Sequence, residues 1–205
     1  MHLELESIRR GGLITKYEKA LNKKLAKLGI KVETRITFSR SEMNHIRQVV
    51  DNIIRQKQFE YIHKKDNTKE FERWLTGMLG ELAVEKALHL KFRDESTGDS
   101  SKYAVPDLKS AGYNVGVKTF CYPNFPVVNR NIDHPQIFVL LSRNKTQAYV
   151  LGIADVALLK KNNANKYNNN LVHCKSMLKR KTAFSEIENL KKITGLQDLE
   201  KYKAA

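Results

Sequence analysis

Two residues that could act on a phosphodiester, Asp107 and Lys118, lie in one short stretch, VPDLKSAGYNVGVKT (residues 105–119). A carboxylate can hold a divalent ion that polarises a phosphate and lowers the pKa of a bound water. A nearby lysine can orient that water or stabilise the negative charge that develops on the phosphate. The stretch therefore predicts phosphodiester hydrolysis with a hard ion such as Mg²⁺ (or Mn²⁺).

Gly116 stands two residues before Lys118, where metal-dependent hydrolysis would be helped by a second carboxylate. Other carboxylates come from FERWLTGMLGELAVEKALHL (residues 71–90), which predicts a helix with Glu81 and Glu85 one turn apart at the edge of its apolar stripe. Glycine costs about 1 kcal/mol inside a helix, so Gly77 and Gly80 indicate that a neighbouring element or a substrate approaches closely. Both glutamates are also compatible with surface pairing to lysines.

Residues 105–119 are expected to form a hairpin that positions the candidate groups. Asp107 would begin the first strand and Lys118 would lie in the second. Side chains alternate between the two faces of a strand. Val117 would then face the core, while Lys118 and Asp107 would meet on the opposite, polar face.

The remaining pattern predicts an α/β fold with a mixed central sheet flanked by helices. A capping box, Ser39-x-x-Glu42, opens a predicted helix over residues 39–59. Further strands are expected at 32–38, 136–142 and 147–153, and further helices at 154–161 and 183–193. Residues 1–31 are interpreted as a basic helical extension and residues 32–205 as the main domain.

The charge of the chain indicates a polyanionic partner. Lys and Arg number 37 against 22 Asp and Glu, which gives a net charge of +15. Such an excess favours nucleic acid, although a basic surface kept for solubility or for an acidic protein stays open. The candidate nucleic-acid contacts are Lys23, Lys24 and Lys27 of the extension, Arg130 in the loop after the predicted hairpin, and Lys175, Lys179, Arg180 and Lys181 near the C-terminus.

The cysteines and the hydropathy argue against other classes of protein. Cys121 and Cys174 lie far apart in sequence, which favours neither a disulfide framework nor a zinc site. No stretch approaches the roughly 18 consecutive apolar residues of a membrane span. We expect a cytoplasmic protein, or a nuclear one if the host has a nucleus, without a membrane partner.

These features together resemble the PD-(D/E)XK nuclease superfamily, which has a restriction-endonuclease-like core. The resemblance spans roughly residues 34–160 and covers most of the chain. It rests on Pro106-Asp107, on Gly116-Val117-Lys118, on GMLGELAVEKAL (residues 77–88), and on the two strands that follow.

The resemblance implies a set of site residues. Glu81 and Asp107 would bind the metal, and Val117 would offer its backbone carbonyl. Lys118 would assist the attacking water, and Glu85 is the reserve acid. Residues 32–205 would then be the nuclease domain.

Gly116 departs from the family pattern, because Asp or Glu usually stands at its position. Some members, including transposon-end-cleaving enzymes, resemble the chain in lacking this acid. This favours a site completed by Glu81 that holds one metal, or that holds a second metal weakly. The leading hypothesis is a Mg²⁺-dependent DNA endonuclease. The alternatives are an inactive DNA-binding protein that keeps the fold, or a nuclease subunit of a larger nucleic-acid-processing assembly. RNA as substrate, a homodimer and a partner protein also stay open.

Overall fold

The computed structural model describes residues 26, 34–56, 70–96, 105–121, 126–129, 132–161, 181–184 and 187–204. The chain divides into two compact units, residues 1–33 and 34–205, and every described residue except residue 26 belongs to the second. Most of the predicted nucleic-acid contacts lie outside the described residues: Lys23, Lys24, Lys27, Arg130, Lys175, Lys179 and Arg180.

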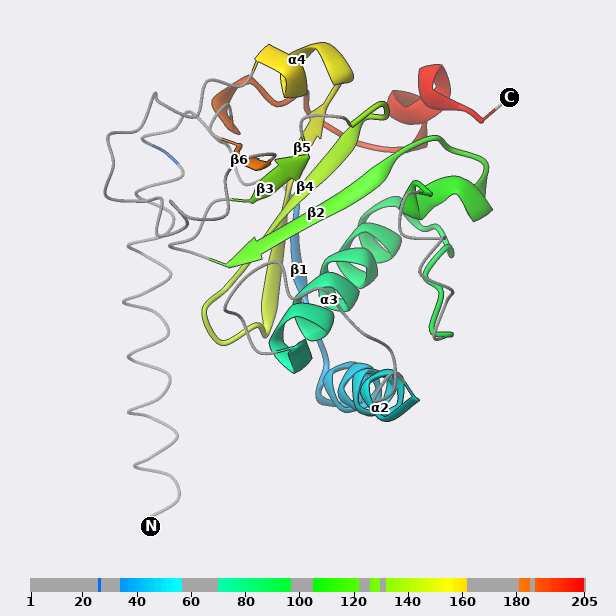
Figure 1. The fold of residues 1–205 in the computed structure, drawn as a ribbon, viewed down its shortest axis with the longest axis vertical. Helices are drawn as coiled ribbons and strands as arrows, with labels where there is room; N and C mark the ends of the chain where they lie inside the picture. The colour runs from blue at the N-terminus through cyan, green and yellow to red at the C-terminus, as the bar shows by residue number, and fades with distance from the viewer. Residues whose placement is uncertain are drawn as a thin grey trace. The chain divides into compact units, whose positions relative to one another are not determined.

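Two long helices form where the sequence predicts them. Helix α2 (Arg40–Gln56) begins at the expected capping box, in which the Ser39 N–H donates to Glu42 Oε2 at 2.7 Å and the Glu42 N–H donates to Ser39 Oγ at 3.2 Å. Helix α3 (Glu70–Leu88) packs on α2 and on one face of the main sheet, as Figure 1 shows. Both helices bury an apolar face, which supplies most of their stability in a folded domain.

The main sheet has four described strands in the order β1-β5-β4-β2. Their bounds are β1 (Arg35–Thr37), β2 (Gly116–Cys121), β4 (Gln136–Leu141) and β5 (Gln147–Ala154). Strand β2 pairs in parallel with β4, whereas β5 is antiparallel to both β4 and β1. Strand β2 therefore has one paired side and one open side among the described strands.

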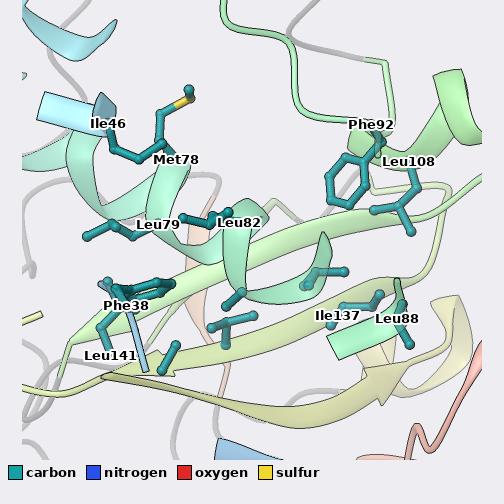
Figure 2. Packing of buried hydrophobic residues seen from close by; sticks show 14 of the residues in the cluster. Phe38, Ile46, Met78, Leu79, Leu82, Leu88, Phe92, Leu108, Ile137 and Leu141 are labelled. Carbon is teal, nitrogen blue, oxygen red and sulfur yellow. The ribbon is translucent and has the colours of Figure 1, made fainter. Parts of the chain in front are cut away.

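The face of the sheet that meets α3 contains the hydrophobic core. Figure 2 shows Leu79 and Leu82 of α3 above Ile137 and Leu141 of β4, all within one buried cluster. Gly80 makes this contact close, because a Cβ at its position would lie 1.6 Å from Thr119 Oγ1 on β2. The predicted close approach is thus confirmed at Gly80, whereas a Cβ at Gly77 would meet nothing within 4 Å.

C-terminal segments pack against the opposite face. A small second sheet pairs β3 (Val127–Asn129) with β6 (Lys181–Ala183), and Phe184 stacks on Phe138 of β4 with ring centroids 4.4 Å apart. Gly152 has a φ of +142°, and a Cβ there would lie 2.5 Å from the Lys191 carbonyl oxygen. Gly152 therefore allows a bulge in β5 and the close approach of the C-terminal segment.

The predicted hairpin over residues 105–119 is wrong in its first half. Residues Asp107–Ala111 form the 3₁₀ helix η2, and β2 pairs with β4 instead of with this segment. Pro106 fixes the φ that starts the turn, and its carbonyl accepts the Lys109 N–H at 3.1 Å. Gly112, at a φ of +86°, ends the turn in the left-handed conformation.

The predicted C-terminal helix over residues 183–193 is also wrong. The described part contains the end of β6, the short 3₁₀ helix η3 (Ile187–Asn189) and a bridge between Lys191 and Ile153. The apolar residues of this segment are nevertheless buried, as their spacing predicted: Phe184, Ile187 and Ile193 all lie in the interior. Helix α4 (Val156–Lys161) and the 3₁₀ helix η4 (Leu196–Tyr202) complete a mixed α/β fold around a mixed sheet.

Candidate active site

The candidate site lies at the open side of β2, where the backbone of Val117 is not used by the sheet. Gly116 donates its N–H to the Pro135 carbonyl at 2.9 Å. In a parallel pair, alternate residues of a strand bond to the same neighbour, so the N–H and C=O of Val117 both face away from β4. The Val117 N–H instead donates to Asp107 Oδ2 at 2.5 Å.

The segment that carries Asp107 is closed by its own hydrogen bonds. Leu108 donates its N–H to the Val115 carbonyl at 2.9 Å, and the Tyr113 N–H returns to the Leu108 carbonyl at 3.1 Å. The Leu108 side chain is fully buried and anchors the turn in the core. Asp107 therefore lies beside β2 through a 3₁₀ turn and a side-chain hydrogen bond to the Val117 backbone, where the prediction expected a paired strand and a meeting with Lys118.

Asp107 sits in an environment that opposes its ionisation. Loss of hydration raises the pKa of Asp107, while the Val117 N–H, Lys118 and His134 act to lower that pKa. The residue as a whole is exposed, and solvent contact moderates the loss of hydration at its carboxyl group. Lys118 and His134 are thus close enough to attract the Asp107 carboxylate.

Glu81 of α3 joins Asp107 electrostatically. Burial and then the negative charge of Asp107 raise the pKa of Glu81 to about 8, against an opposing attraction from Arg93. Like charges that share a partly desolvated site cannot both ionise easily, so such a pair takes up a proton or a cation. Glu81 of α3 therefore lies near Asp107, and Asp107 in turn lies near Lys118, beside the start of β2.

Glu85, the reserve acid, has a different environment. Its side chain is buried, and its Oε1 accepts the backbone N–H groups of Phe92 and Arg93, each at 2.9 Å. Its Oε2 lies 3.8 Å from Arg93 Nη1 and has no hydrogen-bond partner. Glu85 therefore holds the segment after α3 in place, which is a structural use of the carboxylate.

His134, which lies just before β4, is a further residue near Asp107. It precedes β4, its Nδ1 lies 2.8 Å from Asp133 Oδ1, and its side chain is 15% exposed. Its place beside Asp107 follows from the parallel pairing of β4 with β2.

The donor set at this edge suits one hard divalent cation. Glu81 and Asp107 offer carboxylate oxygens, and ladder geometry directs the Val117 carbonyl to the same open side. Mg²⁺ is commonly held by one or two carboxylates with waters filling its other positions. Within the described residues, no group of three or more His, Cys, Asp or Glu side chains gathers as a metal cluster. The two acids therefore fit a water-rich site better than an all-protein cage.

The basic contacts can be placed in one case only, and then only by backbone. Lys181 begins β6 and is paired in register with Asn129 of β3.

In the part of the chain that the structure describes, no helix has the length and apolar character needed to cross a membrane.

Comparisons with protein-family models, with curated proteins and with solved structures found no match to the chain.

Proposed function

We propose that the chain is a Mg²⁺-dependent DNA endonuclease with a variant PD-(D/E)XK site and a restriction-endonuclease-like core. The observation that carries the proposal is the position of Asp107 beside β2, where its carboxylate accepts the Val117 N–H and interacts electrostatically with both Glu81 and Lys118. A bound cation would relieve the repulsion between the two carboxylates, and the neighbouring lysine could stabilise the negative charge of a phosphate.

Glu81 of α3 and Asp107 of η2 would hold the ion. The ion, when bound, would polarise the scissile phosphate and lower the pKa of a bound water. The hydrogen bond from Val117 fixes the Asp107 carboxylate, so one oxygen is oriented before substrate arrives. Lys118 would stabilise the charge that grows on the phosphate as water attacks.

The net charge of +15 supports a polyanionic substrate for this site. Each lysine or arginine that neutralises a phosphate releases counterions and adds affinity without reading sequence. The charge favours nucleic acid as the substrate class. DNA is proposed over RNA because of the resemblance at residues 106–107 and 116–118.

The second candidate, an inactive DNA-binding protein, is favoured by one observation. The Asp107 carboxylate satisfies the Val117 N–H, and this hydrogen bond alone would give the residue a structural use. The endonuclease needs the negative charge of Asp107 to hold the ion, whereas the inactive binding protein needs only its hydrogen bond to Val117. Asp107→Asn keeps an acceptor oxygen for Val117 and removes the charge.

A metal titration of nuclease activity separates the candidates. Supercoiled, linear and branched DNA, and a single-stranded RNA, are incubated with purified protein in Mg²⁺, Mn²⁺ or EDTA. The proposal expects cleavage of DNA with either metal and none with EDTA. Lys118→Ala should abolish cleavage and leave salt-sensitive DNA binding measurable. Cleavage that persists in EDTA, or full activity in Lys118→Ala, would contradict the proposal.

A further inference from the structure

The space left by the missing side chain of Gly116 is filled from the neighbouring strand. A Cβ at Gly116 would lie 2.3 Å from Gln136 Nε2 and 2.8 Å from Gln136 Oε1. Gln136 is the register partner of Gly116 in the parallel β2–β4 pair. The amide group of Gln136 therefore occupies the position where a side chain from residue 116 would begin.

Gln136 is an unusual residue for this position in the fold. Its side chain is 2% exposed, and only Glu85 and Ser142 join it as buried polar side chains in the described part of the chain. A buried amide is costly unless its polar atoms are engaged. A buried amide at the start of a strand that continues as IFVLL indicates a specific use for the amide.

The amide also lies beside the atoms that organise the candidate site. Residue 117 follows Gly116 directly, and its N–H holds Asp107 at 2.5 Å. The Gly116 N–H is bonded to the Pro135 carbonyl, which fixes the start of β4 against the start of β2. Gln136, Asp107 and the Val117 backbone are therefore grouped around one peptide unit of β2.

We propose that Gln136 takes the place of the missing acid, with its amide oxygen as the third protein side-chain ligand of the divalent ion that Glu81 and Asp107 hold. The inference rests on the proposed function and names the group that completes the site. An amide oxygen is a normal ligand for a hard cation. It adds no charge, so two carboxylates balance one divalent ion, where a third would leave an excess negative charge.

The proposal can be tested by moving the third ligand from position 136 to position 116. Gly116→Asp alone places a Cβ against Gln136 and must displace the amide, since 2.3 Å is far inside contact distance. Combining Gly116→Asp with Gln136→Ala removes the obstruction and returns a carboxylate to the strand position. The double variant should therefore bind the ion when Gly116→Asp alone binds it poorly.

Mn²⁺ binding to the full-length protein, measured by isothermal titration calorimetry, is the readout. Loss of a ligand predicts that Gln136→Ala weakens binding about tenfold, while the isosteric Gln136→Glu strengthens it about tenfold. The double variant should recover at least the affinity of the unmodified protein. Gln48→Ala, at an exposed position on α2, is the matched control and should leave binding unchanged.

Two negative results are distinguishable. Unmodified protein that binds no Mn²⁺ would contradict both the proposed function and the role of Gln136. Unmodified protein that binds Mn²⁺ with an affinity that neither Gln136→Ala nor Gln136→Glu changes would contradict the role of Gln136 alone. Thermal unfolding of each variant in EDTA reports whether it is folded, and the shape-preserving Gln136→Glu keeps the test decisive if Gln136→Ala does not fold.

Discussion

Replacing Glu81 by Gln should remove much of the pH dependence of stability near neutrality. Burial and the Asp107 charge raise the pKa of Glu81 from 4.5 to about 8. The unfolded chain loses this proton near the lower value, whereas the folded protein keeps it up to the higher one. The folded state therefore binds more protons in this window, and the free energy of unfolding falls as pH rises through it.

The expected magnitude follows from the shift. Moving the pKa from 4.5 to about 8 corresponds to about 5 kcal/mol when fully expressed. Glu81 is only half-buried, and solvent screening should reduce the effect to roughly half. We therefore expect the free energy of unfolding to fall by about 2 kcal/mol between about pH 5 and about pH 8. Glu81→Gln has no proton to lose and should not show this fall.

Urea unfolding in EDTA at these two pH values, for the unmodified protein and for Glu81→Gln, measures the difference. Carboxylates whose pKa is lowered, such as Glu42 and Asp155, lose their stabilising effect only at more acidic pH and do not enter this window. Mg²⁺ should stabilise the unmodified protein at the higher pH and have little effect on Glu81→Gln. Equal pH dependence in the two proteins would refute the assignment of Glu81 to a shared acidic site.

Two further predictions concern Asp107 and the α3–β2 contact. Asp107→Asn should keep the hydrogen bond to Val117 and most of the stability while losing cleavage. Asp107→Ala should also destabilise the protein by about 1 kcal/mol, measured by urea unfolding. Cleavage by folded Asp107→Asn would contradict the role of Asp107 in catalysis. Gly80→Ala should destabilise by about 2 kcal/mol or more because its methyl group overlaps Thr119, whereas Gly77→Ala should stabilise by up to about 1 kcal/mol. Thermal unfolding checks this pair, and equal effects would contradict the packing.

Local sequence patterns were sufficient for the elements whose contacts are local or periodic. The capping box at Ser39 and Glu42 and the apolar spacing that follows it predicted α2, and two glycines within a helix pointed to the tight approach found at Gly80. The apolar runs at β4 and β5 were equally readable, since both strands are largely buried.

Non-local pairing explains what the sequence did not reveal. The sequence pattern predicted a hairpin, but Asp107 lies in a 3₁₀ helix and contacts β2 through its side chain. A local pattern does not distinguish this contact from a paired strand. The parallel pairing of β2 with β4 places His134 and Gln136 beside the site, and nothing in their immediate neighbours indicates this. The group that fills the position of a side chain at Gly116 likewise comes from the neighbouring strand β4, and a local motif does not contain this information.

The most direct test of the central claim is Mg²⁺-dependent cleavage of a supercoiled plasmid by the unmodified protein and by folded Asp107→Asn. We expect nicked or linear DNA with the unmodified protein in Mg²⁺, and intact plasmid with EDTA or with Asp107→Asn. Intact plasmid at every Mg²⁺ concentration with the unmodified protein, or equal cleavage by both proteins, would contradict it.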